Sequence, residues 1–183
     1  MRRERLVSVL LLVGLVVWGC AGTSGSMLTA PKPPEGVTPP VITAFFAADK
    51  GTYRDPIKVY LAAEQKEGAM ETIAVQVSQV GYGDYPLNRT YLKEGHRERF
   101  VGYLQWNAPG GGSLPEGTRI SIDIAVLDRW GKQSNEIVLP YEFTLGEGSP
   151  SALPAPFNQA DVPRLGYITI VLRNPFKIER SGH

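Results

Sequence analysis

Between about residues 40 and 145, hydrophobic and polar residues alternate in short runs separated by turn-forming residues. Successive side chains of a β-strand point to opposite faces of a sheet, so a period of two predicts strands with one buried face. The clearest example is TRISIDIAVLD (118–128), which sets a row of aliphatic side chains against a mostly polar row. The other runs are PVITAFFA (40–47), PIKVYLAAE (56–64), ETIAVQVSQ (71–79), RERFVGYLQW (97–106) and EIVLPYEFT (136–144).

About seven such strands in roughly a hundred residues predict a sandwich of two β-sheets over residues 40–145. Segment 61–70 also contains good helix formers, but Gly68 interrupts it, and we interpret it as a strand end followed by a hairpin. Pro140 has no backbone N–H to donate. It therefore predicts that the last strand of this block lies at a sheet edge or contains a bulge.

The end of this block, IAVLDRWGKQSNEIVLPYEF, resembles the end of bacterial immunoglobulin-like or fibronectin-type-III-like domains. In those domains a strand ends in Asp, a Gly-containing turn and a Ser follow, and a hydrophobic strand closes the domain. Asp128, Gly131, Lys132 and Ser134 match that pattern. The resemblance implies an all-β, immunoglobulin-like β-sandwich, although the cysteine pair of antibody domains is absent.

Residues 146–183 begin with a proline-rich segment (146–163) and continue with the run RLGYITIVLR (164–173). In this run Ile168, Ile170 and Leu172 alternate with Tyr167, Thr169 and Val171. Both rows are mostly apolar, which predicts an additional C-terminal strand that is covered on both sides. Pairing with an edge of the chain's own sandwich is favoured over addition to the sheet of a partner.

The chain starts with three arginines, followed by an apolar segment of 13 residues (6–18). A helix of that length is about 20 Å long, shorter than the ~30 Å hydrocarbon core of a bilayer. A positively charged start followed by a short apolar helix is typical of a signal peptide.

The apolar segment ends in Val17-Trp18-Gly19-Cys20, which resembles the lipobox of bacterial lipoproteins, with Trp18 in place of the usual small residue. The resemblance implies that residues 1–19 are a signal peptide cleaved before Cys20. It also implies that Cys20 carries a diacylglycerol on its thiol and an acyl group on its amine. Two or more acyl chains hold a protein stably on a membrane. Ala21 and Gly22 lack the Asp that retains such proteins in the inner membrane. An outer-membrane site in a bacterial cell envelope, facing the periplasm or the cell surface, is therefore favoured over the inner membrane.

Residues 20–39 are small, polar and rich in proline and glycine. Such a segment buries too little apolar surface to offset the entropy of ordering, so we expect a disordered or extended tether. At about 3 Å per residue it would hold a domain a few tens of ångströms from a bilayer.

Composition argues against several classes of function. Removal of residues 1–19 changes the formal net charge from +1 to −1, because three arginines and one glutamate are lost, and no basic stripe indicates nucleic-acid binding. One cysteine permits no internal disulfide, and two histidines are too few for a typical zinc site. His96 lies in the charged run KEGHRER and is expected to be exposed. We predict no catalytic residues, no metal ligands and no small-molecule cofactor.

Two stretches are candidate binding surfaces. GYGDYPLNRTY (81–91) gathers Tyr82, Tyr85 and Tyr91 in a predicted loop, and DRWGKQSN (128–135) places Arg129 and Trp130 on a tight turn. Aromatic side chains on loops supply large contact areas at low entropic cost. In the alternative interpretation, Tyr82 and Tyr91 cover the ends of the core and Trp130 folds back over a strand. Asp128 is expected to cap its turn.

The sequence therefore favours a lipid-anchored envelope protein whose sandwich is a non-enzymatic binding or scaffolding module. An unknown envelope protein or a glycan would be its partner. The alternative is a carbohydrate-binding domain or an accessory of a cell-wall or polysaccharide enzyme. That alternative predicts a surface row of aromatic side chains from Tyr85, Trp106 and Trp130, whereas a protein partner predicts an exposed apolar patch or an unpaired sheet edge near 165–173.

Overall fold

A computed structural model describes residues 32–52, 55–107, 114–146 and 152–174. These residues contain ten strands, one short 3-10 helix and no α-helix, which confirms the all-β prediction. The elements are β1 (Val41–Phe46), β2 (Lys50–Gly51), β3 (Ile57–Glu64), β4 (Met70–Gln79), β5 (Gly83–Asp84), β6 (Asn88–Tyr91), η1 (Glu94–His96), β7 (Arg99–Trp106), β8 (Arg119–Asp128), β9 (Ile137–Phe143) and β10 (Arg164–Ile168).

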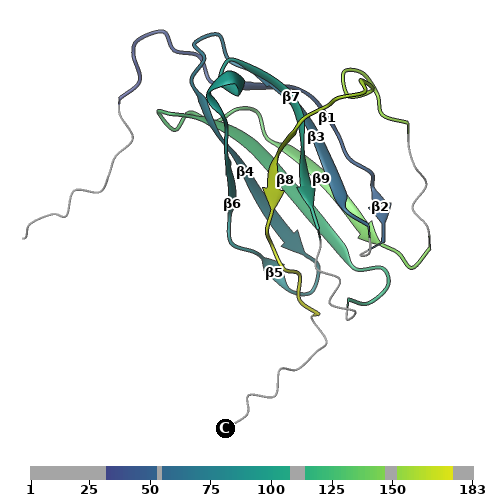
Figure 1. The fold of residues 1–183 in the computed structure, drawn as a ribbon. Helices are drawn as coiled ribbons and strands as arrows, with labels where there is room; N and C mark the ends of the chain where they lie inside the picture. Colours follow the sequence, from purple (N-terminus) through teal and green to yellow (C-terminus); the bar gives the residue numbers. More distant parts are fainter. Residues whose placement is uncertain (1–31, 53–54, 108–113, 147–151, 175–183) are drawn as a thin grey trace, which may run out of the picture.

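The strands form two sheets that pack face to face (Figure 1). One sheet has the order β1-β3-β7-β10, and the other has the order β2-β9-β8-β4-β5, with β6 also paired to β4. Neighbouring strands are antiparallel except for β10 beside β7 and β2 beside β9, which are parallel. Both sheets are therefore mixed.

The core between the sheets consists of the aliphatic and aromatic rows that the alternation predicted. On β8 the inner row is fully or nearly fully buried, and the inner row of β7 includes Trp106, which has no exposed surface. Burial of one such side chain stabilises the fold by about 1.5–3 kcal/mol relative to its exposure. The buried inner-row residues of the long strands are Ile57, Val59, Leu61, Ile73, Val75, Val77, Phe100, Leu104, Trp106, Ile120, Ile122, Ile124, Val126, Ile137, Leu139, Tyr141 and Phe143.

Strand β1 departs from the predicted pattern, which placed Ile42, Ala44 and Phe46 on one side. Its pairing with β3 shifts register between Ile42 and Ala44. An extra residue at such a bulge moves the following side chains to the opposite face. Ile42 accordingly lies in the core between the sheets, whereas Ala44 and Phe46 pack in a second cluster on the outer face of the four-stranded sheet.

This second cluster is covered by residues 152–163, which we call the strap. The strap follows the end of β9 and leads to the start of β10 on the far edge of the four-stranded sheet (Figure 1). Phe157 of the strap has no exposed surface, and its ring centroid lies 5.6 Å from that of Tyr60. The middle of the outer row of β3, Tyr60 and Ala62, is therefore buried too, which the alternation in its sequence does not reveal.

Strand β10 confirms that the C-terminal run pairs within the chain, in parallel with β7. A Cβ atom at Gly102 would lie 2.5 Å from Cγ of Leu165, and one at Gly166 would overlap Thr90. Glycine at these two positions lets β10 approach both β7 and β6.

The prediction that the C-terminal run is covered on both sides was wrong. Ile168 and the next two residues of its row are buried, but Tyr167 and Val171 are 43% and 61% exposed. β10 is the last strand of its sheet, and the strap does not extend over its outward row in the described part of the chain.

The prediction that the strand of Pro140 is an edge strand or contains a bulge was wrong, because β9 lies between β2 and β8 in regular register with β8. Pro140 nevertheless lies on the part of β9 that β2 leaves unpaired. The N–H groups of Glu142 and Thr144 point away from β8 and donate to the carbonyls of Asp49 and Gly51 beside β2. With a period of two, an N–H at position 140 would also point away from β8. β2 pairs only with Glu142 and Phe143, so proline costs no hydrogen bond here and removes the outward donor at position 140.

Replacing Pro140 by threonine is expected to promote self-association. The new outward N–H would lie close to Val138, which is 61% exposed, and would complete an edge to which a second strand can pair. Sedimentation velocity over a concentration series should show dimers or larger species, with a change in unfolding free energy below about 1 kcal/mol. Ser121→Thr, on the residue that pairs with Pro140, is the matched control. A strictly monomeric Pro140→Thr variant would contradict this role.

The buried phenol of Tyr141 is expected to make the stability of the fold depend on pH in the alkaline range. Burial, with a smaller contribution from the charge of Asp55, raises the pKa of its phenol from 10.0 to about 12. The stability from keeping this phenol neutral is fully present below pH 10 and is lost as the pH rises through about 12. Urea unfolding between pH 9 and 12 should therefore show a steeper loss for the wild type than for Tyr141→Phe, and equal slopes would contradict the assignment.

Candidate functional site

The predicted signal peptide (1–19) and Cys20 lie outside the described residues, as does most of the predicted tether. Within the described part of the chain, no helix is long and apolar enough to span a membrane.

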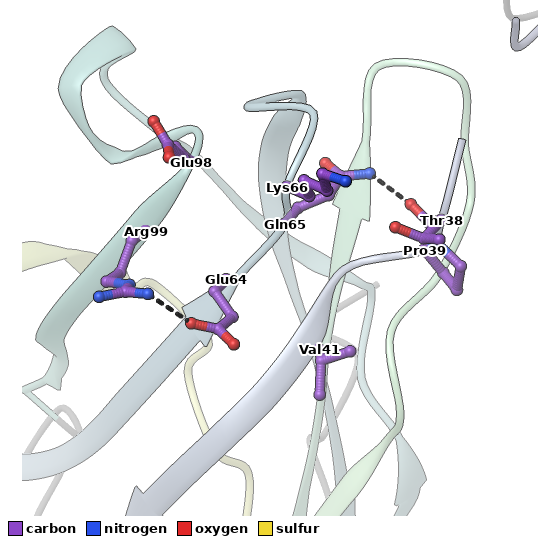
Figure 2. A pocket seen from close by; sticks show the side chains of 8 residues that line it. All are labelled: Thr38, Pro39, Val41, Glu64, Gln65, Lys66, Glu98 and Arg99. Atoms are coloured by element: carbon purple, nitrogen blue, oxygen red, sulfur yellow. Dashed lines mark hydrogen bonds and ion pairs between the residues drawn. The ribbon is translucent and has the colours of Figure 1, made fainter. Parts of the chain in front are cut away.

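The end of the tether region is bound firmly to one end of the sandwich. Thr38 donates from its backbone N–H and its hydroxyl to the carboxylate of Glu67. Its carbonyl accepts from Nε2 of Gln65 at 2.8 Å, the bond drawn in Figure 2. Lys132 Nζ donates to the carbonyl of Val37 at 2.5 Å. Hydrogen bonding from the Thr38 backbone lowers the pKa of Glu67. Two turns, before β4 and after β8, thus fix the point at which the chain enters the domain.

Asp128 connects these two turns. Its Oδ1 accepts the backbone N–H groups of Trp130 and Lys132 at 2.9 and 2.8 Å, and its Oδ2 accepts Nε2 of Gln65 at 3.0 Å. The predicted cap of the turn is confirmed. The Asp128 carboxylate is buried, so its role is to stabilise the turn.

A pocket of about 380 Å³ lies beside this entry point (Figure 2). Its lining carries charges of both signs, including an ion pair of 3.0 Å between Glu64 and Arg99 whose side chains are 50% and 76% exposed. Such a pair contributes at most about 1 kcal/mol. Among the described residues no group of three His, Cys, Asp or Glu side chains is placed to hold a metal ion.

The structure separates the predicted binding residues. Tyr82 and Tyr85 follow the end of β4 and stack with ring centroids 4.8 Å apart, whereas Tyr91 pairs with Thr72 near the start of β4. Tyr91 is 70% exposed and Tyr82 is 44% exposed, so the interpretation of these two as covers of the core was wrong. Tyr85, in contrast, is buried.

Arg129 and Trp130 lie at the opposite end of the sandwich from Tyr82. The N–H of Arg129 donates to the carbonyl of Ala69, just before β4, and its guanidinium carbon lies 5.6 Å from the Trp130 ring. Trp130 is half-buried, whereas Trp106 and Tyr85 are buried. The aromatic row that the carbohydrate-binding alternative required is therefore not formed by these three residues.

A groove of about 440 Å³ lies at the end of the sandwich where β4 finishes. One wall comes from the segment that connects β5 to β6, and the other from the residues that follow β10. Three exposed apolar side chains line it: Tyr82, Leu87 and Val171, which are 44%, 45% and 61% exposed. We call this feature the end groove; its lining comprises Tyr82, Tyr85, Pro86, Leu87, Asn88, Thr169, Ile170, Val171 and Arg173.

Side chains hold the second wall in place, although residues 169–173 form no strand. The Trp106 indole N–H donates to the carbonyl of Ile170 at 2.8 Å. The Tyr85 hydroxyl accepts the N–H of Arg173 at 2.8 Å and donates to the side-chain oxygen of Gln79, and Nε2 of Gln79 donates to the carbonyl of Arg173 at 2.8 Å. Burial raises the pKa of Tyr85. Tyr85 therefore positions the groove wall, a role that sequence reasoning did not assign to it.

Sequence reasoning did not name Leu87, Val171 or Arg173 as binding residues, although it associated a protein partner with an exposed apolar patch or an unpaired sheet edge near 165–173. Leu87 is an aliphatic residue in an otherwise polar and aromatic loop, and Val171 belongs to the outward row of the C-terminal run. These two positions were therefore only weak indications of a binding surface. Their meeting depends on two segments about 85 residues apart, which no local pattern predicts.

A scan against models of known protein families and a search of curated proteins find no match to this chain.

Proposed function

We propose that this chain is a lipid-anchored envelope protein. In this proposal an immunoglobulin-like sandwich binds a protein partner through the end groove and catalyses no reaction. The strand order supports the immunoglobulin-like assignment. β1, β3 and β7 face β4, β8 and β9, the same succession as strands A, B and E opposite strands C, F and G in that architecture. β10 takes the edge beside β7.

One observation carries the binding proposal: the exposed apolar groove lies at the end of the sandwich opposite the chain's entry point. Thr38 is bound by Gln65 and Glu67, just before β4, and Tyr82 follows the end of β4. Ten residues of β4 separate the two ends by about 30 Å. In Figure 1 the described chain enters at the upper left and ends below, near β5.

The start of the sequence supports the anchor. Arginines, a short apolar segment and Cys20 occur in the order that lipid attachment requires. A lipid on Cys20, followed by the tether, would leave the end groove facing away from the bilayer. A groove of several hundred Å³ with apolar walls has the size and character of a binding site.

Cys20→Ser is expected to abolish the anchor. The unlipidated precursor of this variant should lack the mass of the acyl chains and should be released from its normal anchoring, since the acyl chains are the source of stable membrane attachment. Intact-mass measurement and cell fractionation test this, with Thr23→Ser as the control that keeps Cys20. An unchanged lipid-modified mass in Cys20→Ser would refute the anchor.

The binding proposal is tested by site-specific photocrosslinking in living bacterial cells. A photoreactive amino acid at Leu87 or Val171 should give one adduct of defined mass. The same group at Val138, which is equally exposed but lies on β9, should not give that adduct. Absence of adducts from both groove positions, or identical adducts from all three, would refute binding at the groove.

A further inference from the structure

Arg173 is fixed at the rim of the end groove. Its N–H donates to Tyr85 and its carbonyl accepts from Gln79. Two buried side chains therefore hold the backbone of Arg173 on either side of its Cα atom. The guanidinium itself is exposed and forms no ion pair with the described residues. Asp84, in β5, lies outside the groove lining, and its carboxylate accepts the Ser78 hydroxyl at 2.6 Å. Within residues 32–174 as described, this positive charge beside the apolar groove is paired with no carboxylate.

The groove wall also contains an acceptor without a donor. Nδ2 of Asn88 donates to the Thr169 hydroxyl at 2.9 Å and joins the two walls. Oδ1 of the same amide is buried and has no hydrogen-bond partner among the described residues. An unpaired buried acceptor costs about 1–3 kcal/mol. A ligand N–H group would recover part of that cost if the Asn88 amide turned to present Oδ1 to the groove; a peptide supplies such a group and a hydrocarbon chain does not.

We propose that the end groove binds an extended peptide segment in which an Asp or Glu lies beside an aromatic or aliphatic residue. The apolar side chain would pack between Tyr82, Leu87 and Val171, and the carboxylate would pair with Arg173. Guanidinium and carboxylate groups form charge-assisted, often bidentate hydrogen bonds, and complementary charge at the rim selects the partner. This inference rests on the proposed binding function and names the chemistry of its partner.

The test is selection of a random peptide library, displayed on phage, against the full chain in detergent. The displayed peptides are joined to the coat protein through their C-termini, so only side-chain carboxylates are offered. Enriched peptides should pair an acidic residue with Phe, Trp or Leu. Their affinity should fall about tenfold or more on Arg173→Glu and recover in part on Arg173→Lys. Arg129→Glu, which reverses an exposed arginine at the far end, should leave it unchanged.

A second selection on the Arg173→Glu chain makes the test reciprocal, because the enriched peptides should then carry Lys or Arg. No enrichment on the wild type, enrichment without an acidic bias, or affinity insensitive to Arg173→Glu would overturn the inference. A third outcome would favour an anionic lipid over a peptide and would overturn the inference. In that outcome no peptide is enriched, the wild-type chain binds dodecanoate at this groove, and Arg173→Glu abolishes that binding. Crosslinks from Leu87 in cells together with a failed selection would leave the proposed function intact and refute only the partner chemistry.

Discussion

Replacing Trp106 by alanine should lower the free energy of unfolding by about 3–5 kcal/mol, the range for removal of a fully buried aromatic side chain. Trp106 has no exposed surface and lies on β7 between Ile57 of β3 and Ile168 of β10. Its indole also holds the carbonyl of Ile170. Small domains have net stabilities of about 5–15 kcal/mol, and this chain has no disulfide to compensate.

Two controls separate the causes of this loss. Trp106→Phe keeps most of the ring volume but leaves the Ile170 carbonyl without its donor, so a smaller loss of about 1–3 kcal/mol is expected. Trp130→Ala removes a half-buried tryptophan outside the core and should cost less. Urea unfolding followed by far-ultraviolet circular dichroism measures all three. A Trp106→Ala chain within 1 kcal/mol of the wild type would contradict the central position of this residue.

Replacing Phe157 by alanine should release the strap. Phe157 is fully buried against Tyr60 and contributes the largest strap side chain of the second cluster, so the expected loss is about 3–5 kcal/mol. Because this cluster is separate from the core between the sheets, the loss should include local opening of the strap.

Limited proteolysis distinguishes local opening from general unfolding. In Phe157→Ala the first cleavages should fall within residues 152–163 and occur at least about tenfold faster than in the wild type, because a strap held less tightly is open for a larger fraction of the time. Phe45→Ala, at a phenylalanine that is 49% exposed, is the matched control and should change little. Cleavage of the strap at the wild-type rate would show that Phe157 does not hold it.

The parts of the fold that depend on neighbours in sequence were predictable. The inner rows of β3, β4, β7, β8 and β9 follow directly from alternation, and Asp128 has the role that a turn-capping carboxylate implies. Each of these depends on the residue's own backbone or on residues two to four positions away.

The parts that depend on distant contacts were not predictable. The bulge in β1 is set by packing on both faces of its sheet, and Phe157 reaches Tyr60 from almost a hundred residues away. Tyr85 looked like a loop aromatic available for binding, yet its hydroxyl contacts Arg173, 88 residues later. The end groove exists because β10 pairs in parallel with β7, a pairing that requires a crossover whose destination the sequence does not specify.

The fixed entry point at Thr38 has a mechanical consequence. Thr38 and Arg173 are held at opposite ends of the sandwich, and β1 runs away from the entry end, from its Val41–Glu64 pair to its Phe46–Tyr60 pair. Tension applied between the two ends therefore acts along the strand axes. It loads the hydrogen bonds between β1 and β3 together in shear, whereas a pull across the sheet would break them one after another. The hydrogen bonds between β1 and β3 would therefore resist such a load in shear geometry.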